Sequence, residues 1–263
     1  MHRAMDSAYF GHPAFIPFRR MLAAAAPPDL ARLNAWATES GLAQDDETPL
    51  RFVPGTSVNA LAYEQAIAMR SEIGVRPANW HDAFNALVWL TLPRTKCALN
   101  ARHVATATMT ATMPNVRTRE RDAATLIDES GLILACDDDN LVELLRRHAW
   151  RALFVDGRDR VDAAFLPLIV GHGLLDKLRN PYRGITAHVL IVPRSPLPDT
   201  ATAADPDAVA VLDRAAAARI GTSPLTPASL RPLPVAGLAG WDTEALGAQL
   251  FDDLTVFRPS VLV

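Results

Sequence analysis

The sequence predicts an α+β fold, mainly α-helical, built as a single domain over residues 1–263 with a small antiparallel or mixed β-sheet. Three observations lead to this expectation. Segments whose apolar residues recur with the helical period outnumber the short apolar runs of strand length. Hydrophobic residues make up 49% of the chain and charged residues 21%, a balance that supports one sizeable core. No internal repeat divides the chain.

Four helices are expected in the first half of the chain, after an irregular arm over residues 1–27. Proline and glycine mark their ends, because proline is tolerated in the first turn of a helix and glycine favours the C-cap. The third is almost wholly apolar and should be buried, and Pro93 separates it from the fourth. A short extended segment is expected over 50–53 and a loop over 106–121. The four helices cover residues 29–40, 60–73, 80–90 and 93–105.

The second half of the chain is expected to hold most of the strands. Apolar runs flank Asp128-Glu129-Ser130-Gly131, a pattern typical of a β-hairpin, and residues 185–192 have the composition of a strand. A flexible loop rich in Pro, Thr, Ala and Asp is expected over 193–206. A Pro-rich tail, 222–263, should wrap the body and carry a short helix near 243–251. Further helices are expected over residues 141–154, 163–178 and 207–220.

Charge, cysteine usage and hydropathy narrow the classes of protein. The formal net charge is -3, and acidic neighbours surround the arginines that a nucleic-acid surface would need, so nucleic acid is not an expected partner. No apolar stretch reaches the roughly 18 residues that cross a bilayer. Cys97 and Cys136 lie far apart in the sequence, so we expect two reduced thiols and not a disulfide framework. Reduced thiols favour a cytoplasmic protein. The oligomeric state is left open. The arginines concerned are Arg117, Arg119, Arg121, Arg146, Arg147 and Arg151.

Several residue blocks between Tyr63 and Pro259 form a specific combination. They include Trp80-His81-Asp82-x-Phe84-Asn85-Ala86-Leu87-Val88-Trp89, Pro93-Arg94-x-Lys96, Leu99-Asn100, His103, Asp128-Glu129-x-Gly131, His148-x-Trp150, Leu153-Phe154, Gly171-His172, Lys177, Gly184-x-Thr186-Ala187-His188, Pro232-Leu233-Pro234-Val235, Gly240-Trp241 and Val256-Phe257-Arg258-Pro259. Together they resemble a proteobacterial family of unknown function. The resemblance implies that the chain is a member of this family, but it does not indicate a reaction that the protein catalyses. One position departs from the pattern, since Asp176 stands before Lys177 where glutamate is expected, and the shorter carboxylate shifts the reach of any ligand there.

Polar residues in the buried helices are the first candidates for chemistry. His81 and Asn85 are four residues apart and share one helix face. Lys96, Asn100 and His103 share a face of the next helix, so a kink at the intervening proline would bring five polar groups together. A buried histidine serves as general base or metal ligand, and the pKa of a buried lysine is easily shifted. The alternative is that these groups satisfy irregular backbone, or that the second set faces solvent.

A second set of candidates lies further along the chain. His172 and Asp176 have the spacing of a carboxylate that orients an imidazole, or of two metal ligands, or of a surface hydrogen bond. Gly171, within the helix expected there, predicts a close backbone approach beside His172. His188 interrupts a strand as a ligand or as a satisfied core residue. The paired acids at 128–129 either hold a cation or are solvated turn residues.

These residues favour an enzyme, a metal- or His-assisted hydrolase with a polar pocket between helices and a small-molecule substrate. The catalytic candidates are His81, Asn85, His172 and Asp176. A divalent metal, Zn, Mn or Mg, would be held by His81, His172, His188 and a carboxylate. The alternative is a non-catalytic ligand- or protein-binding module in which the same groups form a buried structural network. The further candidates are Asp82, Lys96, Asn100, His103, Asp128, Glu129 and Lys177.

Overall fold

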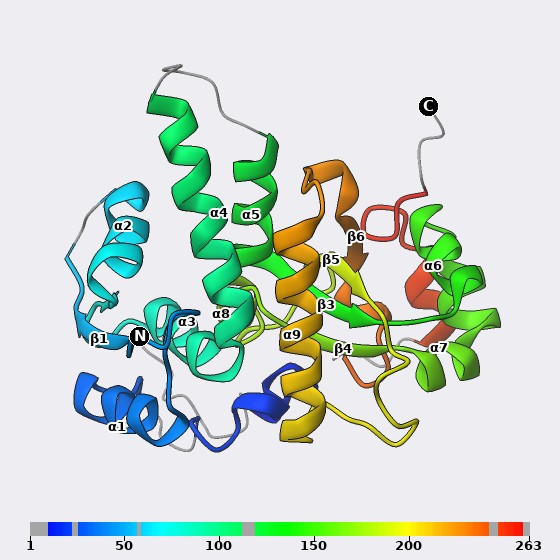
Figure 1. The fold of residues 1–263 in the computed structure, drawn as a ribbon. Helices are drawn as coiled ribbons and strands as arrows, with labels where there is room; N and C mark the ends of the chain where they lie inside the picture. Colours follow the sequence, from blue (N-terminus) through cyan, green and yellow to red (C-terminus); the bar gives the residue numbers. More distant parts are fainter. Residues whose placement is uncertain (1–9, 23–25, 57–58, 112–118, 242–246, 260–263) are drawn as a thin grey trace.

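The computed structural model describes residues 10–22, 26–56, 59–111, 119–241 and 247–259. Helices form one end of the molecule, and a four-stranded sheet lies beside them with further helices at its far end (Figure 1). In the part of the chain that is described, no helix combines the length and the apolar character needed to cross a membrane. The expected mainly helical α+β architecture with a small mixed sheet is confirmed.

The N-terminal half contains most of the long helices. Each of the first two helices begins at a side-chain cap and ends at a residue in the left-handed region, Gly41 for α1 and Ser71 for α2. Helix α3 is buried along most of its length. Helix α4 follows it directly, with Pro93 in its first turn. The elements are η2 (Pro13–Phe18), α1 (Leu30–Ser40), β1 (Arg51–Pro54), α2 (Ala60–Arg70), β2 (Glu72–Val75), α3 (Trp80–Thr91) and α4 (Pro93–Ala111).

The chain after residue 118 alternates helices with the strands of the main sheet. Helix α9 packs against α4, β3 and β5, and α4 and α5 run side by side (Figure 1). The elements are α5 (Arg119–Ser130), β3 (Gly131–Ala135), α6 (Asp139–Arg146), η3 (Ala152–Asp156), α7 (Arg158–Ala164), β4 (Leu166–Ile169), α8 (His172–Lys177), β5 (Thr186–Val192), α9 (Pro206–Thr222), η4 (Pro227–Ser229), β6 (Arg231–Pro234), η5 (Val235–Gly237) and η6 (Gly247–Asp252).

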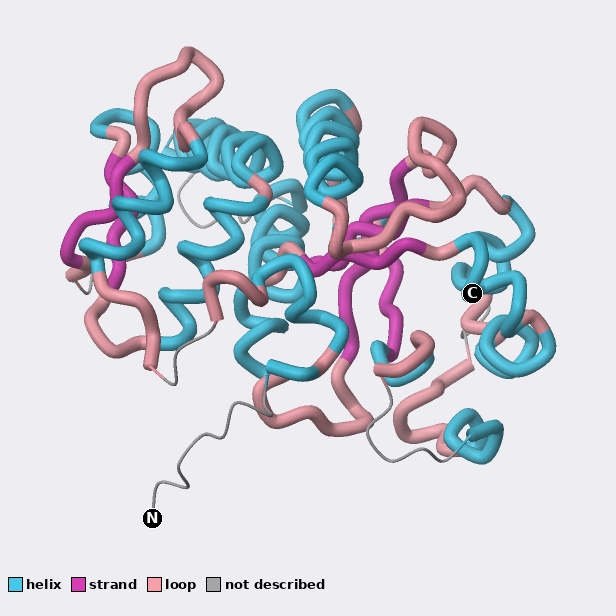
Figure 2. The backbone as a smooth tube through the Cα atoms, turned by 90° about the horizontal axis from the view of Figure 1, so that it is seen from below, coloured by secondary structure: helices cyan, strands magenta, loops and turns pink. Residues whose placement is uncertain are grey.

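The main sheet is mixed and has the strand order β4-β3-β5-β6. Its central strands β3 and β5 are parallel, with Ile133 opposite Leu190, and the two outer strands are antiparallel to them. Every residue of β3 is buried, because β4 and β5 flank it and helix α9 packs against it. The parallel pair β1–β2 lies well away from this sheet, at the helical end of the molecule (Figure 2).

The prediction of a β-hairpin around residues 128–131 is wrong. Its first arm is helix α5, in which Ala123, Ala124 and Ile127 are buried at helical spacing. Asp128 and Glu129 therefore lie on the last turn of a helix, not in a hairpin turn. The second arm is correct and forms β3, whose neighbours are distant in sequence. Short apolar runs do not distinguish a strand from a buried helix turn, which explains the error.

The single helix expected over 163–178 is also wrong. The segment contains the end of α7, the strand β4 and the short helix α8. Pro167 removes a backbone donor and Gly171 is the N-cap of α8, so neither residue stands inside a helix. Strand β4 tolerates its proline because it is an edge strand.

Smaller differences concern element ends. Helix α4 extends to Ala111 in place of the expected loop, while residues 112–118 lie outside the described part. The helix expected over 141–154 breaks after Arg146, where His148 has a φ of 53°. Strands β2 and β6 were not expected. Of the helix expected near 243–251, residues 243–246 are not described, and the rest lies in η6.

Aromatic side chains attach the two ends of the chain to the body. In the described part of the N-terminal segment, Phe15 and Phe18 are fully buried. In the C-terminal segment, the ring of Phe251 stacks on Phe154 at 5.6 Å, and Phe257 is buried beside them. Aromatic side chains of both segments therefore add apolar area to the core.

Two junctions of the chain touch each other through backbone atoms. Gly131 begins β3 and Gly171 precedes α8, and a Cβ at Gly171 would lie 2.6 Å from both the Cα and the N atom of Ser130. The close backbone approach predicted beside His172 is therefore confirmed. Because no side chain fits between these junctions, the end of α5 and the start of α8 are held in direct contact.

We expect Gly171→Ala to lower the free energy of unfolding by about 3 kcal/mol, since the methyl group would overlap backbone that cannot move away. The φ of Gly171 is -69°, so backbone strain does not contribute to this cost. Gly221→Ala is the matched control, because nothing lies within 4 Å of its Cβ position in α9. It should stabilise the protein by about 0.5 kcal/mol. Equal urea midpoints for the two variants would contradict this packing argument.

Candidate metal centre

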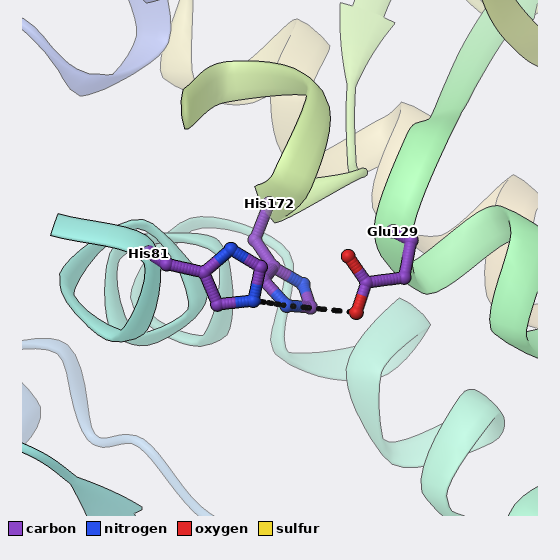
Figure 3. A group of neighbouring side chains, drawn as sticks. All are labelled: His81, Glu129 and His172. Atoms are coloured by element: carbon purple, nitrogen blue, oxygen red, sulfur yellow. Dashed lines mark hydrogen bonds and ion pairs between the residues drawn. The ribbon is translucent and has the colours of Figure 1, made fainter. Parts of the chain in front are cut away.

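Two histidines from distant parts of the chain meet at the ends of two helices. His81 is the second residue of α3, whose N-cap is the side chain of Asn79. His172 is the first residue of α8 and is 5% exposed. Their Nε2 atoms lie 3.1 Å apart, and the rings stand at 68° to each other (Figure 3). Both imidazoles therefore direct a nitrogen at the same point.

A carboxylate completes the group. Glu129, on the last turn of α5, places Oε1 3.6 Å from Nε2 of His172 (Figure 3). One ligand atom from each of the three residues lies within 4.8 Å of the others. A Cβ at Gly173 would come 2.5 Å from Oε2 of Glu129, so this glycine leaves the space that the carboxylate occupies.

Two of the three separations are close to those around a single cation. Zinc binds imidazole nitrogen at about 2.0 Å, and tetrahedral angles then separate two ligand atoms by about 3.3 Å. The observed 3.1 Å and 3.6 Å bracket this value. Without a cation, the short Nε2–Nε2 contact requires one ring to carry its proton on Nε2 and donate it to the other.

A buried ion pair supports His172 from behind. Oδ2 of Asp128 lies 3.9 Å from Nδ1 of His172, a nitrogen that has no hydrogen-bond partner among the described residues. Oδ1 of the same carboxylate accepts from Nζ of Lys96, which is 3% exposed. Burial lowers the pKa of His172 more than the charge of Asp128 raises it, so the ring is neutral near pH 7. A neutral imidazole is the form that binds metals.

The electrostatics keep Asp128 ionised. Burial alone would raise the pKa of this carboxyl group, but the ammonium of Lys96 and the neighbouring His172 outweigh burial and lower that pKa to about 2. The negative charge beside Nδ1 of His172 favours a proton on that nitrogen. The lone pair of Nε2 is then available at the centre of the group.

The three residues open onto a cavity of about 690 Å³ between α2, α3, α4 and α5. Glu64 of α2 contributes to its wall, and its Oε2 accepts a hydrogen bond of 2.6 Å from Nδ2 of Asn100. Burial, followed by the charge of Asp128, raises the pKa of Glu64 to about 7. The cavity thus holds a carboxyl group that exchanges a proton near neutral pH.

The Glu64 side chain should make stability depend on pH. Its pKa is raised from 4.5 to about 7 on folding, so the stabilisation that it gives is complete below pH 4.5 and is lost as the pH rises toward 7. In metal-free protein, Glu64→Gln should therefore raise the free energy of unfolding by about 1–3 kcal/mol at alkaline pH and by little in acid. Glutamine still accepts from Asn100. Urea unfolding across this range measures the difference, and a difference independent of pH would contradict the assignment.

The structure places the other candidates differently from the sequence analysis. Asn85 donates its amide to the hydroxyl of Tyr63 at 2.7 Å, not to His81. Asp176 forms an ion pair with Arg179 at 2.9 Å, so the carboxylate that faces His172 is Asp128. The predicted pairing of Asp176 with His172 is corrected accordingly.

His188 lies outside the group formed by His81, Glu129 and His172, because its Nδ1 is 2.9 Å from the hydroxyl of Ser130. Of the expected ligands, His81, His172 and a carboxylate lie together among the described residues, and His188 lies apart from them. Asp82 binds the guanidinium of Arg76 at 2.7 Å and Lys177 is exposed.

The face of α4 that was open to either interpretation points inward. Lys96 and Asn100 are both buried, and His103 is half-buried on the cavity wall, where burial lowers its pKa. Sequence reasoning missed Tyr63 and Glu64. Their helix α2 shows no polar interruption of an apolar face, so the sequence carries no signal for them.

The family comparison covers most of the chain. A family model described as "Protein of unknown function (DUF3025)" matches residues 50–261. The chain belongs to this family. The family of unknown function expected from the sequence agrees with this match, and a proteobacterial source stays a prediction. All the residues of the candidate centre fall within the DUF3025 span. Searches of curated proteins and of solved structures gave no match.

Proposed function

We propose that this DUF3025 chain is a metal-dependent hydrolase whose divalent cation is bound by His81, Glu129 and His172. The observation that carries the proposal is the convergence of two imidazole nitrogens, 3.1 Å apart, with a carboxylate beside them. Two histidines and one glutamate are a donor set of catalytic zinc in hydrolases, and it leaves a fourth position open. Magnesium fits less well, because it prefers oxygen ligands.

A divalent cation in such a site supplies a water activated for attack near neutral pH. The residues of the chain have separate tasks around it. The charge of Asp128, 3.9 Å from Nδ1 of His172, favours the tautomer that presents Nε2, and Lys96 keeps Asp128 ionised. Glu64, whose pKa is about 7, is the cavity group best suited to accept and return a proton. The cavity of about 690 Å³ has the size of a small-molecule site.

The proposal is tested by measuring metal content and hydrolytic activity on the same protein samples. Elemental analysis of purified protein should find about one zinc per chain, and chelation should abolish turnover on a panel of chromogenic esters, amides and phosphodiesters. Adding back one equivalent of zinc should restore it. His81→Ala should lose both metal and activity, whereas His188→Ala should keep both, because His188 is bonded to Ser130 and lies outside the ligand group.

Three outcomes would contradict this proposal. Turnover that survives chelation and His81→Ala would exclude the centre as its source. Protein that binds no cation would favour the non-catalytic module, in which an Nε2–H of one imidazole donates to the other and joins α3 to α8. Bound iron with oxygen consumption would also contradict hydrolysis, since two histidines and a carboxylate serve iron oxygenases as well.

A further inference from the structure

A hydrogen-bonded pair on the cavity wall has an unused polar atom. Asn85 is 8% exposed and its Nδ2 donates to the hydroxyl of Tyr63 at 2.7 Å. Its Oδ1 is buried and has no hydrogen-bond partner in the described part of the chain. Both side chains line the cavity that contains the metal-ligand group. A buried unpaired amide oxygen is costly, so a site that keeps one is suited to a ligand that pairs with it.

The pair offers one donor and one acceptor to the cavity. Burial, followed by the charges of Glu64 and Asp128, raises the pKa of Tyr63, so its hydroxyl keeps its proton. That proton is free to be donated, because the hydroxyl accepts from Asn85, while Oδ1 of Asn85 remains an acceptor. Reversing the amide exchanges the two roles and preserves the same complement.

The position of Asn85 fixes the distance of this pair from the metal centre. Asn85 follows His81 by four residues on α3, so the two side chains share a face of the helix. Four residues advance an α-helix by about 6 Å. A ligand group held by Asn85 and Tyr63 would thus lie about one helical turn from the cation.

We infer that Tyr63 and Asn85 form a substrate subsite for a carboxamide group, about one helical turn from the reacting bond. A carboxamide supplies both an N–H for the acceptor and a C=O for the donor, so it satisfies the pair fully. A carboxylate has no proton to donate and would be repelled by the neighbouring Asp128 and Glu64. This inference rests on the proposed metal centre, and it narrows the substrates to amide-containing small molecules.

The test uses two hydroxamates that bind zinc in the same way. The first carries a carboxamide two methylene groups from the hydroxamate carbonyl, and in the second an isopropyl group of the same shape replaces that carboxamide. Calorimetric titration of zinc-loaded protein should show a preference of about tenfold for the carboxamide probe. Tyr63→Phe and Asn85→Leu should each reduce the ratio of the two affinities to one or below, while the isopropyl probe binds as tightly as before.

Each outcome decides between the two claims. If both probes bind wild type equally, or if the ratio is unchanged in Tyr63→Phe and Asn85→Leu, the subsite is overturned while the metal centre stands. If a variant weakens both probes equally, its residue acts on the structure of the centre and not on the carboxamide. If zinc does not bind at all, the proposed function itself fails and the subsite with it.

Discussion

Replacing His172 by alanine is expected to raise the zinc dissociation constant by more than about 100-fold and to remove the proposed hydrolytic activity. The variant loses one of the two proposed imidazole ligands, and the remaining pair, His81 and Glu129, offers too few protein donors to hold zinc tightly. Loss of a group that only orients a ligand typically costs about 10–100-fold, so Asp128→Asn should have a smaller effect than His172→Ala. Competition with a fluorescent zinc chelator measures both affinities.

The control for this prediction lies on the same short helix. Asp176 is one turn after His172 on α8 and forms its ion pair with Arg179, away from the ligand atoms. Asp176→Asn should bind zinc as wild type does. Melting curves of the metal-free proteins separate ligand loss from unfolding. An unchanged zinc affinity in folded His172→Ala would show that the imidazole is not a ligand.

Replacing Lys96 by methionine is expected to lower the free energy of unfolding by about 3–5 kcal/mol. Methionine keeps much of the side-chain volume of lysine, but it leaves the carboxylate of Asp128 buried without the ammonium group that neutralises it. Nζ of Lys96 also lies 5.4 Å from the centre of the Trp89 ring, a contact that adds to the loss. Urea unfolding of metal-free protein at neutral pH measures the change.

The double variant Lys96→Met/Asp128→Asn shows whether the stranded charge is the cause. Removing both charges should recover most of the stability that Lys96→Met loses, because a neutral amide costs far less to bury than an unpaired carboxylate. It should not recover zinc affinity, since the carboxylate that faces Nδ1 of His172 is absent. A double variant as unstable as the single one would show that packing, not charge, accounts for the effect.

Local signals predicted the parts of the fold that local interactions determine. Asp29 and Gly41 at the ends of α1, and Pro93 at the start of α4, mark boundaries that the structure keeps. The strands of the mixed sheet were harder to predict from the sequence. The residues of β4 make strand hydrogen bonds only because β3, distant in sequence, lies beside them. Tertiary pairing of this kind overrides local propensity.

The candidate centre was predicted in part. His81 and His172 were chosen from their helix positions, and the structure places their nitrogens together. Glu129 was predicted as a possible cation ligand, but in a hairpin turn and not on a helix. Its proximity to His172 depends on the backbone contact of Gly131 with Gly171. That contact joins two junctions 40 residues apart in numbering (171 − 131). No pattern within one helix carries such information.

X-ray absorption spectroscopy of the zinc-loaded protein tests the central claim most directly. We expect one zinc per chain with two imidazole nitrogens and a carboxylate oxygen at about 2.0 Å, and weaker imidazole scattering in His81→Ala. Thiolate sulfur in the coordination shell, or a spectrum unchanged by His81→Ala, would place the metal elsewhere and contradict the assignment of His81, Glu129 and His172.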